Sequence, residues 1–148
     1  MASDFFSSMS ISARGMSAQR ERMDVVAQNI ANADATRTAR GGPYRRRQVV
    51  FEAVKAGQSF DSVFRDTMQH DAPRAVRVHS VVEDPTPFRE IYNPGHPDAD
   101  ARGIVKMPNV NPVQEMVDMT AAARSFEANV TAMEASKRMF MRSLDLLK

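Results

Sequence analysis

Hydrophobic side chains recur every seven residues near the start of the chain. Met9, Met16, Met23 and Ile30 form one row that starts at Ala2. A second row lies four positions later and consists of Phe6, Ala13, Arg20, Ala27 and Asp34. A four-three spacing of apolar residues is typical of helices that pack along a seam. The pattern predicts a helix over about residues 4–33, roughly 45 Å long at 1.5 Å per residue.

The same repeat returns at the end of the chain. It predicts a second helix over about residues 112–147, which begins cleanly because Asn111 can cap it and Pro112 suits the first helical position. Together the ends predict a coiled-coil-like pair of long helices. One row of this helix is Met119, Phe126, Met133, Phe140 and Leu147, and the other is Met116, Ala123, Val130, Lys137 and Leu144.

The middle of the chain has a different pattern. All eight prolines lie between Pro43 and Pro112, where they prevent long helices. Alternating or β-branched runs predict short strands at 46–52 and 74–84, with shorter ones at 88–92 and 103–107, while 59–68 is ambiguous. The expected fold is mainly α with a small β-rich insert. The expected division is an N-terminal helix (1–36), a loop and β-rich middle (37–108) and a C-terminal helix (109–148).

Both predicted seams are weak. Ala13, Ala27 and Ala123 bury little area, and Arg20 and Lys137 place a charge in each stripe. Ordering costs about 1–2 kcal/mol per residue, so an isolated helix pair of this kind should be marginal. One hypothesis is that the helices become fully ordered only in a helical assembly; the alternative is a self-sufficient monomer with methionine filling its core. The two charged side chains either extend out of the seam or reach acidic groups on another subunit.

Asparagines cluster where the predicted helices end and begin. Side chains of this type either cap a helix or fix the segment beside it, and both interpretations stay open. A further possibility is that they hydrogen-bond to adjoining subunits. The residues that we expect to set the helix ends and their register are Asn29, Asn32, Asp34, Asn109, Asn111 and Pro112.

Composition excludes several classes of site. The chain has no cysteine, so it offers no disulfide, thiolate nucleophile or zinc–thiolate site. The net charge of +2 is too small to indicate a polyanion partner by itself. No apolar run approaches the ~18 residues of a membrane span, and we expect no cleaved signal peptide.

Two clusters could carry chemistry. Arg45, Arg46 and Arg47, beside Tyr44, could contact phosphates, which leaves a basic helical nucleic-acid-binding protein as the alternative function. The run HPDAD at 96–100 has the residue types of a cation site but reads more simply as an Asx and proline turn. His70 and His79 have no motif partners, and no nucleophile elbow or phosphate-binding loop occurs. We therefore expect no enzyme, no catalytic or metal-binding residue and no cofactor.

Longer stretches resemble a known family. SAQRERMDVVAQNIANADATRT (17–38), followed by PYRRRQVVFE (43–52), resembles the N-terminal signature of bacterial flagellar rod and hook proteins. The tail from His96 to Met139 is most similar to proximal members of the rod. The chain is too short for the large extra domain of the distal rod and hook relatives.

The resemblance implies a structural building block of the flagellar basal body. Such a subunit would be exported uncleaved by the flagellar type III apparatus and would form a periplasmic axle that transmits torque and surrounds the export channel. Its partners would be itself, other rod proteins, a membrane-ring adapter and distal rod components, with no nucleic acid or small-molecule substrate. The expected subunit interface is Phe6, Met9, Met16, Met23, Ile30, Met116, Met119, Ala123, Phe126, Val130, Met133, Phe140, Leu144 and Leu147.

Overall fold

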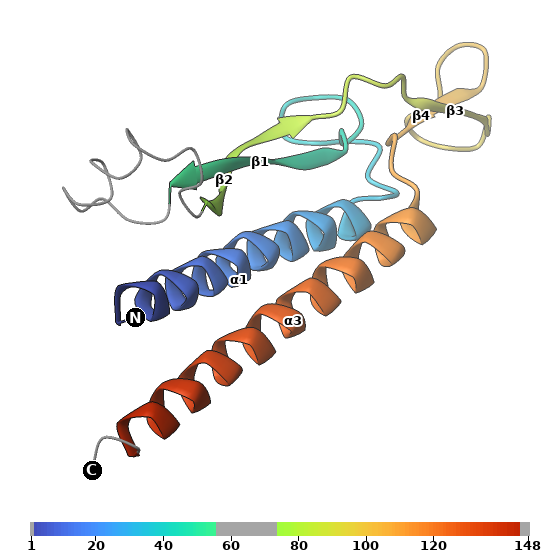
Figure 1. The fold of residues 1–148 in the computed structure, drawn as a ribbon. Coiled ribbons are helices and arrows are strands. Elements are labelled where there is room, and N and C mark those ends of the chain that lie inside the picture. Colours follow the sequence, from blue (N-terminus) through green and yellow to red (C-terminus); the bar gives the residue numbers. More distant parts are fainter. Residues whose placement is uncertain (1, 56–73, 146–148) are drawn as a thin grey trace. The chain divides into compact units, whose positions relative to one another are not determined.

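The computed structural model describes residues 2–55 and 74–145 (Figure 1). Along the chain, a long helix is followed by four strands and a second long helix. This order confirms the expected fold, which is mainly α with a small β-rich insert. The ambiguous segment 59–68, together with His70 and Leu147, lies outside the described residues. The elements are α1 (Ala2–Ala31), β1 (Arg47–Lys55), β2 (Arg74–Glu83), β3 (Arg89–Tyr92), β4 (Ile104–Met107) and α3 (Pro112–Asp145).

The start of α3 is the predicted one. The side-chain oxygen of Asn111 accepts the backbone N–H of Val113 at 3.1 Å, and its carbonyl accepts the N–H of Glu115 at 3.0 Å. Asn111 is therefore the N-cap, and Pro112 occupies a position whose missing N–H costs nothing. α1 ends at Ala31, two residues before the predicted end, and tight turns continue the chain to Ala35.

The strands form two small sheets. β1 pairs with β2, and β3 pairs antiparallel with β4 so that Ile91 lies opposite Val105. β1 continues three residues beyond the predicted end, to Lys55. The two short strands predicted at 88–92 and 103–107 are confirmed as β3 and β4.

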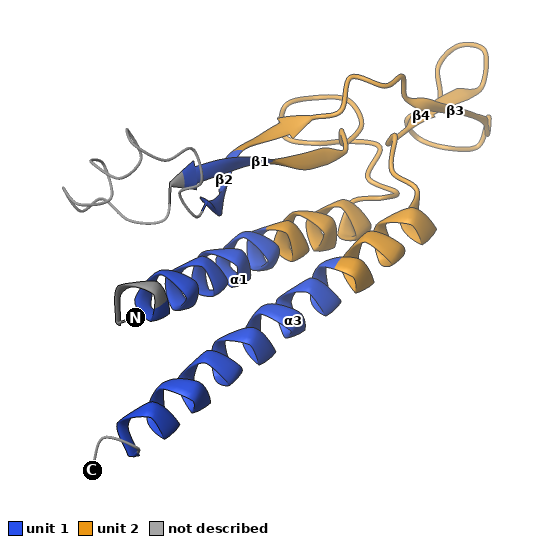
Figure 2. Cartoon of the chain, viewed as in Figure 1, with its two compact units in different colours: residues 1–21, 51–79, 122–148 blue, residues 22–50, 80–121 orange. Residues whose placement is uncertain are grey.

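The chain divides into two compact units (Figure 2). Unit 1 comprises residues 1–21, 51–79 and 122–148, and unit 2 comprises 22–50 and 80–121. The division cuts α1, β1, β2 and α3, so each unit contains part of each of these elements. The division at residues 36 and 108 separates helices from insert and stays a prediction.

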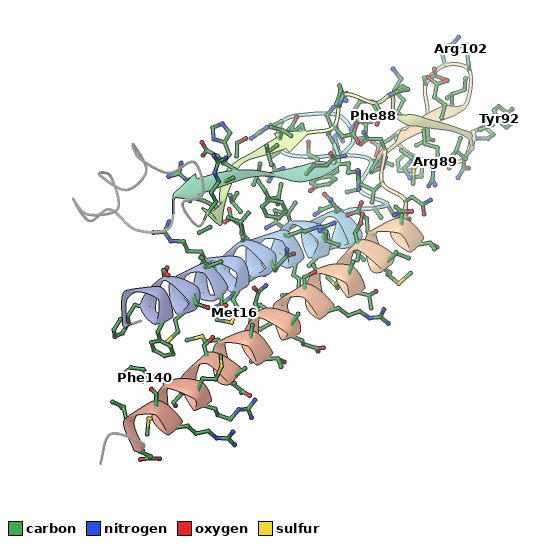
Figure 3. The ribbon with its side chains drawn as sticks, in the orientation of Figure 1. Met16, Phe88, Arg89, Tyr92, Arg102 and Phe140 are labelled. Carbon is green, nitrogen blue, oxygen red and sulfur yellow. The ribbon has the colours of Figure 1, made fainter. Side chains whose placement is uncertain are left out.

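In unit 1 the two helices run antiparallel and approach closely. The rings of Phe5 and Phe140 stack with centroids 4.4 Å apart. A Cβ at Gly15 would lie 2.8 Å from Oδ1 of Asn129, so any larger residue there would force the Asn129 side chain to move. Figure 3 shows Met16 and Phe140 on the two helices.

Unit 2 holds the apolar cluster of the insert. Ala33, Tyr44 and Val110 are buried together, with Ala35 packed against them. Val105 of β4 is 2% exposed, and Val25 and Val26 of α1 are buried as well. The core of this unit is therefore small, and polar contacts must contribute to its stability.

The residues buried on α3 differ by one position from one predicted row. Met119, Phe126, Met133 and Phe140 are half-buried as a row. The companion positions that the chain buries are Glu115, Ala122 and Ser136, whereas Met116 is 53% and Leu144 42% exposed. The small side chains of Ala122 and Ser136 let the helices approach closely. The large side chain of Met116, one position after Glu115, therefore stays exposed.

α1 shows the same division. Ser12, Ala18, Val25 and Asn29 are buried, while Phe6 is 62% exposed. The predicted row Met9, Met16, Met23 and Ile30 is half-buried, and Arg20, Ala27 and Lys137 are exposed. Whether the exposed residues contact neighbouring subunits stays a prediction.

The close approach at Gly15 predicts a coupled response to mutation. Gly15→Ala should gain about 1 kcal/mol of helix propensity in an Asn129→Ala background, where the space is free. In the wild-type background the clash with Asn129 should remove or reverse that gain. Urea unfolding of the four proteins of this cycle measures the coupling. Equal effects of Gly15→Ala in both backgrounds would show that the helices do not meet at this position.

Candidate functional site

Asn29, the first residue of the asparagine motif, is fully buried in unit 2. Its amide nitrogen donates to the carbonyl of Arg47 at 2.8 Å and to a carboxylate oxygen of Glu115 at 2.9 Å. Its amide oxygen accepts the hydroxyl of Tyr44 at 3.0 Å and the N–H of Arg47 at 2.9 Å. Both donors and both lone pairs are used, so Asn29 has no capacity left for an adjoining subunit.

Glu115 carries the second half of this contact. Its side chain is 1% exposed, and its other carboxylate oxygen accepts Nε of Arg46 at 2.6 Å. A buried carboxylate is tolerated only when it is paired and hydrogen-bonded, and both conditions hold here. The last turn of α1, the segment before β1 and the first turn of α3 thus meet at one buried point.

Arg46 connects this point to two further carboxylates. Its guanidinium lies 3.5 Å from Asp84 and 3.5 Å from Asp118, and Asp118 also contacts Arg22 at 3.4 Å. Burial lowers the pKa of Arg46, but the bonds to Glu115 and Asp84 outweigh that effect and raise the pKa above its usual value. The cation is therefore firmly retained.

Tyr44 closes the network from the loop side. Burial is the main reason why the pKa of Tyr44 is raised; Arg47 opposes the rise, and Glu115 and Glu83 add to it. The hydroxyl therefore stays protonated and donates to Asn29.

Asn109 and Asp84 fix the outer side of the same region. Asn109 accepts the N–H of Arg46 at 2.8 Å and donates to the hydroxyl of Thr86 at 2.8 Å. Asp84 accepts the amide of Gln48 at 2.9 Å. Hydrogen bonds from the backbone and side chain of Thr86 lower the pKa of Asp84, and Arg46 adds to the effect although partial burial opposes it.

The predicted motif therefore separates into different roles. Asn29 and Asn109 lie in the polar network, and Asn111 caps α3. Asn32 donates to the carbonyl of Gln28 at 2.8 Å, which is a local bond within the last turn of α1. Asp34 is exposed and makes no hydrogen bond among residues 2–55 and 74–145. We call Asn29, Tyr44, Arg46, Asp84, Asn109 and Glu115 the polar anchor.

Four residues of the polar anchor were not predicted in this role. The sequence pattern assigned no role to Glu115 and placed Asp84 at the end of the strand predicted at 74–84. The available signal was a lone acid in the first turn of α3 together with an arginine run that had no acidic neighbour in sequence. Arg46 and Glu115 pair across 69 positions of the sequence, so no local pattern shows the contact. The other two are Tyr44 and Arg46.

The arginine run makes contacts within the chain. Arg45 donates to the carbonyl of Asp84 at 2.8 Å and lies 4.4 Å from the centre of the Phe88 ring. Arg46 belongs to the polar anchor, and Arg47 lies 5.9 Å from the ring of Tyr44. These contacts give the three side chains structural roles, so the arginine run requires no phosphate ligand.

The HPDAD segment forms a turn. Nδ1 of His96 accepts the N–H of Asp98 at 3.1 Å, and Asp100 accepts the N–H groups of Arg102 and Ile104. The latter two bonds are the main cause of the lowered pKa of Asp100. Within the described ranges, no three His, Asp or Glu side chains are placed to hold a metal ion.

A search for membrane-spanning helices also gave none. Neither long helix, taken over its described residues, is apolar enough along its length to cross a bilayer.

Comparisons with known proteins agree with the resemblance. Residues 9–39 match the family model for flagella basal body rod proteins, and residues 101–146 match the model for the C-terminal part of flagellar basal body rod FlgEFG proteins. The flagellar basal-body rod protein FlgC of Bacillus subtilis is 44% identical over 97% of this chain and 98% of its own length. The chain belongs to the FlgC family of flagellar basal-body rod proteins. FlgC of Borreliella burgdorferi is 41% identical, covering 97% of each chain, and that of Salmonella typhimurium is 40% identical, covering 92% of each.

Membership of this family decides between the functional classes. The relatives are structural rod proteins, and the family is not enzymatic. The comparisons give no support for nucleic-acid binding. The two matched regions contain most of α1, with its asparagine motif, and all of α3, so the polar anchor joins the parts of the chain that the family models describe.

The saturated amide of Asn29 predicts a large effect of its removal. Asn29→Ala leaves groups of Tyr44 and Arg47 unpaired and removes the bond to one carboxylate oxygen of Glu115, so the free energy of unfolding should fall by about 3 kcal/mol or more. Asn32→Ala is the matched control and should cost less than about 1 kcal/mol, because its bond is local and half-exposed. Chemical denaturation of both variants measures the difference. Similar losses would mean that Asn29 is only a helix cap.

Asp84 predicts a dependence of stability on pH. Its pKa lies below the ordinary value of 3.8 in the folded chain, so the unfolded chain binds the proton more tightly. The stabilisation is complete above about pH 5 and is lost as the pH falls below 3.8 through the folded-state pKa. Asp84→Asn should therefore flatten the acid limb of the stability curve. An unchanged limb in Asp84→Asn would contradict this assignment.

Proposed function

We propose that this rod protein polymerises with copies of itself and with other rod proteins through apolar faces of α1 and α3. The observation that carries the proposal is that the helices bury several polar residues beside apolar ones such as Val25 and Val26, while many of their large apolar side chains stay exposed. Within the chain they bury Ser12, Asn29, Glu115 and Ser136. Large apolar side chains lie outside, where a neighbouring subunit can cover them.

In unit 2 the exposed large apolar residues of α3 follow one helix face. Val113 is 66%, Met116 53% and Val117 57% exposed. The spacing i, i+3, i+4 places the three side chains on one stripe at the start of α3. A contiguous apolar stripe of this kind is typical of a protein contact site.

In unit 1 the exposed apolar residues are those near the free ends of the helices. Phe6 is 62%, Met139 65% and Met141 53% exposed. The hydrogen bonding inside this unit is incomplete, because the buried side-chain oxygen of Gln19 has no hydrogen-bond partner among the described residues. An unpaired buried acceptor costs about 1–3 kcal/mol, which favours further ordering of these helices on assembly.

The polar anchor holds the end of α1 and the start of α3 rigidly together. It fixes where α1 ends and α3 begins, so subunits would enter the assembly with both helices in one register. Arg20 and Lys137 are exposed in the chain, which suits either side chains extended into solvent or contacts with acids on a neighbour. Asn32 and Asp34 are accessible enough to meet an adjoining subunit.

The finer features of the proposal come from the family resemblance. The assembled subunits would form the proximal rod in the periplasm, transmit torque and surround the export channel. The partners would include a membrane-ring adapter, distal rod components and the flagellar type III export apparatus, which would export the subunit without a cleaved signal peptide. The proposed division into two helical regions and a middle region (37–108) describes the inner and outer parts of that assembly.

The experiment that tests this function is deletion of the gene followed by electron microscopy of purified basal bodies. The deletion strain should lack rods and filaments, and the intact gene should restore both. Complete rods in the deletion strain would overturn the proposal. Retention of the purified protein on DNA at moderate salt would instead favour the nucleic-acid alternative.

The exposed stripe on α3 predicts a separation of folding from assembly. Val117→Asp should change the monomer's stability by less than about 0.5 kcal/mol, because the side chain is already largely exposed. It should nevertheless abolish rods and motility, because a carboxylate buried between subunits has no partner. Gln114→Asp adds the same charge at an exposed polar position of the same turn and should retain motility. Motile cells with Val117→Asp would exclude this stripe from the interface.

A further inference from the structure

β3 forms an exposed edge of its sheet. All four of its residues are exposed, whereas its partner β4 buries Val105 at 2% exposure. Ile91 is 40% and Tyr92 74% exposed. Figure 3 shows Arg89 and Tyr92 at the β3–β4 hairpin.

The register shows which backbone groups of β3 are unpaired. The N–H of Asn93 donates to the carbonyl of Gly103 at 2.8 Å, and Ile91 lies opposite Val105. Hydrogen-bonded pairs alternate along an antiparallel ladder, so Ile91 bonds to Val105 while Glu90 and Tyr92 direct their N–H and C=O groups away from β4. In the described part of the chain these outward groups have no partner.

The opposite edge of the same sheet is partly covered. Ile104 of β4 directs its N–H to the side chain of Asp100 at 3.0 Å, and its carbonyl accepts the N–H of Asp100 at 3.0 Å. The turn at Asp100 therefore covers the start of the β4 edge, and within the described residues no such turn bonds to the outer edge of β3. β3 also lacks the proline, lysine or bulge that usually protects an open edge.

We propose that the outer edge of β3 binds an extended segment of a neighbouring subunit as a third strand. This inference rests on the proposed function, since the neighbour is a subunit of the same assembly. A two-stranded hairpin is marginal alone, and a third strand satisfies the outward groups of Glu90 and Tyr92. The hairpin thereby contributes a contact separate from the helical faces.

The side chains define the chemistry of the added strand. Arg89 and Ile91 lie on one face of β3 and Glu90 and Tyr92 on the other, since side chains alternate. Neither Arg89 nor Glu90 forms an ion pair within residues 2–55 and 74–145. The bound segment should therefore place an apolar residue beside Ile91 and an acidic one beside Arg89.

A second copy of β3 is a poorer occupant. Two copies of β3 could pair antiparallel through their outward groups. The register with the longest overlap and no like charges opposite each other is centred on Ile91, and it gives a closed two-fold pair. Closed pairs do not propagate, whereas a rod needs head-to-tail contacts. Such a pair also joins only short strands, so the area that it buries is far below the ~1,200 Å² typical of stable interfaces.

Glu90→Pro tests the proposal directly. Proline removes an outward N–H but no bond to β4, and edge strands tolerate it. We expect about tenfold fewer rod-bearing basal bodies, corresponding to the loss of one or two backbone bonds at each contact. Glu90→Ala removes the charge but keeps the N–H and should assemble within about twofold of wild type. Equal assembly of both variants would overturn the proposal.

A second measurement separates a missing contact from a damaged hairpin. In cells complemented with Tyr92→benzoylphenylalanine, irradiation of purified basal bodies should cross-link this position to an extended segment of an adjacent rod subunit, and Glu90→Pro should abolish the cross-link. Because the chain has no cysteine, Ile91→Cys provides the complementary assay. An Ile91→Cys disulfide dimer, or the absence of any subunit cross-link, would overturn the proposal. If deletion of the gene leaves rods intact, the proposed function itself fails.

Discussion

The buried hydrogen bonds of Asn29 are the constraint on which unit 2 depends. An amide in a dry site must use all of its donors and acceptors, and here each bond reaches a different part of the chain. Tyr44 comes from the loop, Arg47 from the start of β1 and Glu115 from α3. Losing the amide would leave groups of Tyr44 and Arg47 unpaired and would remove one of the two bonds to Glu115, so all three segments would be less firmly fixed.

This constraint explains how a small apolar core suffices. The cluster of Ala33, Tyr44 and Val110 buries little area, and the ion pairs of Arg46 add directional bonds that apolar packing lacks. A buried pair contributes more to a unique geometry than to net stability, because desolvation offsets most of its Coulomb energy. For a subunit whose function is mechanical, a fixed geometry where the helices meet the insert is the more useful property.

The helices complement that rigid point with incomplete packing. Gly15 approaches the partner helix closely, Ser136 is buried, and large apolar side chains such as Met116 and Met139 stay exposed. If the chain buried every methionine in its own core, fewer apolar side chains would remain for contacts with neighbouring subunits. We infer that the exposed apolar side chains and the open strand edge are costs to the monomer that assembly would reduce.

The sequence alone determined the elements that rest on local periodicity and capping. Seven-residue repeats located both helices, Asn111 and Pro112 located the start of α3, and alternation located β3 and β4, because each signal lies within a few residues. The family resemblance likewise came from contiguous motifs. Only the tertiary structure decided that Asn29 lies in a buried network and that α3 buries Glu115 rather than Met116. Those facts depend on pairing between residues up to 86 positions apart, and on a rotation of one residue that periodicity cannot resolve.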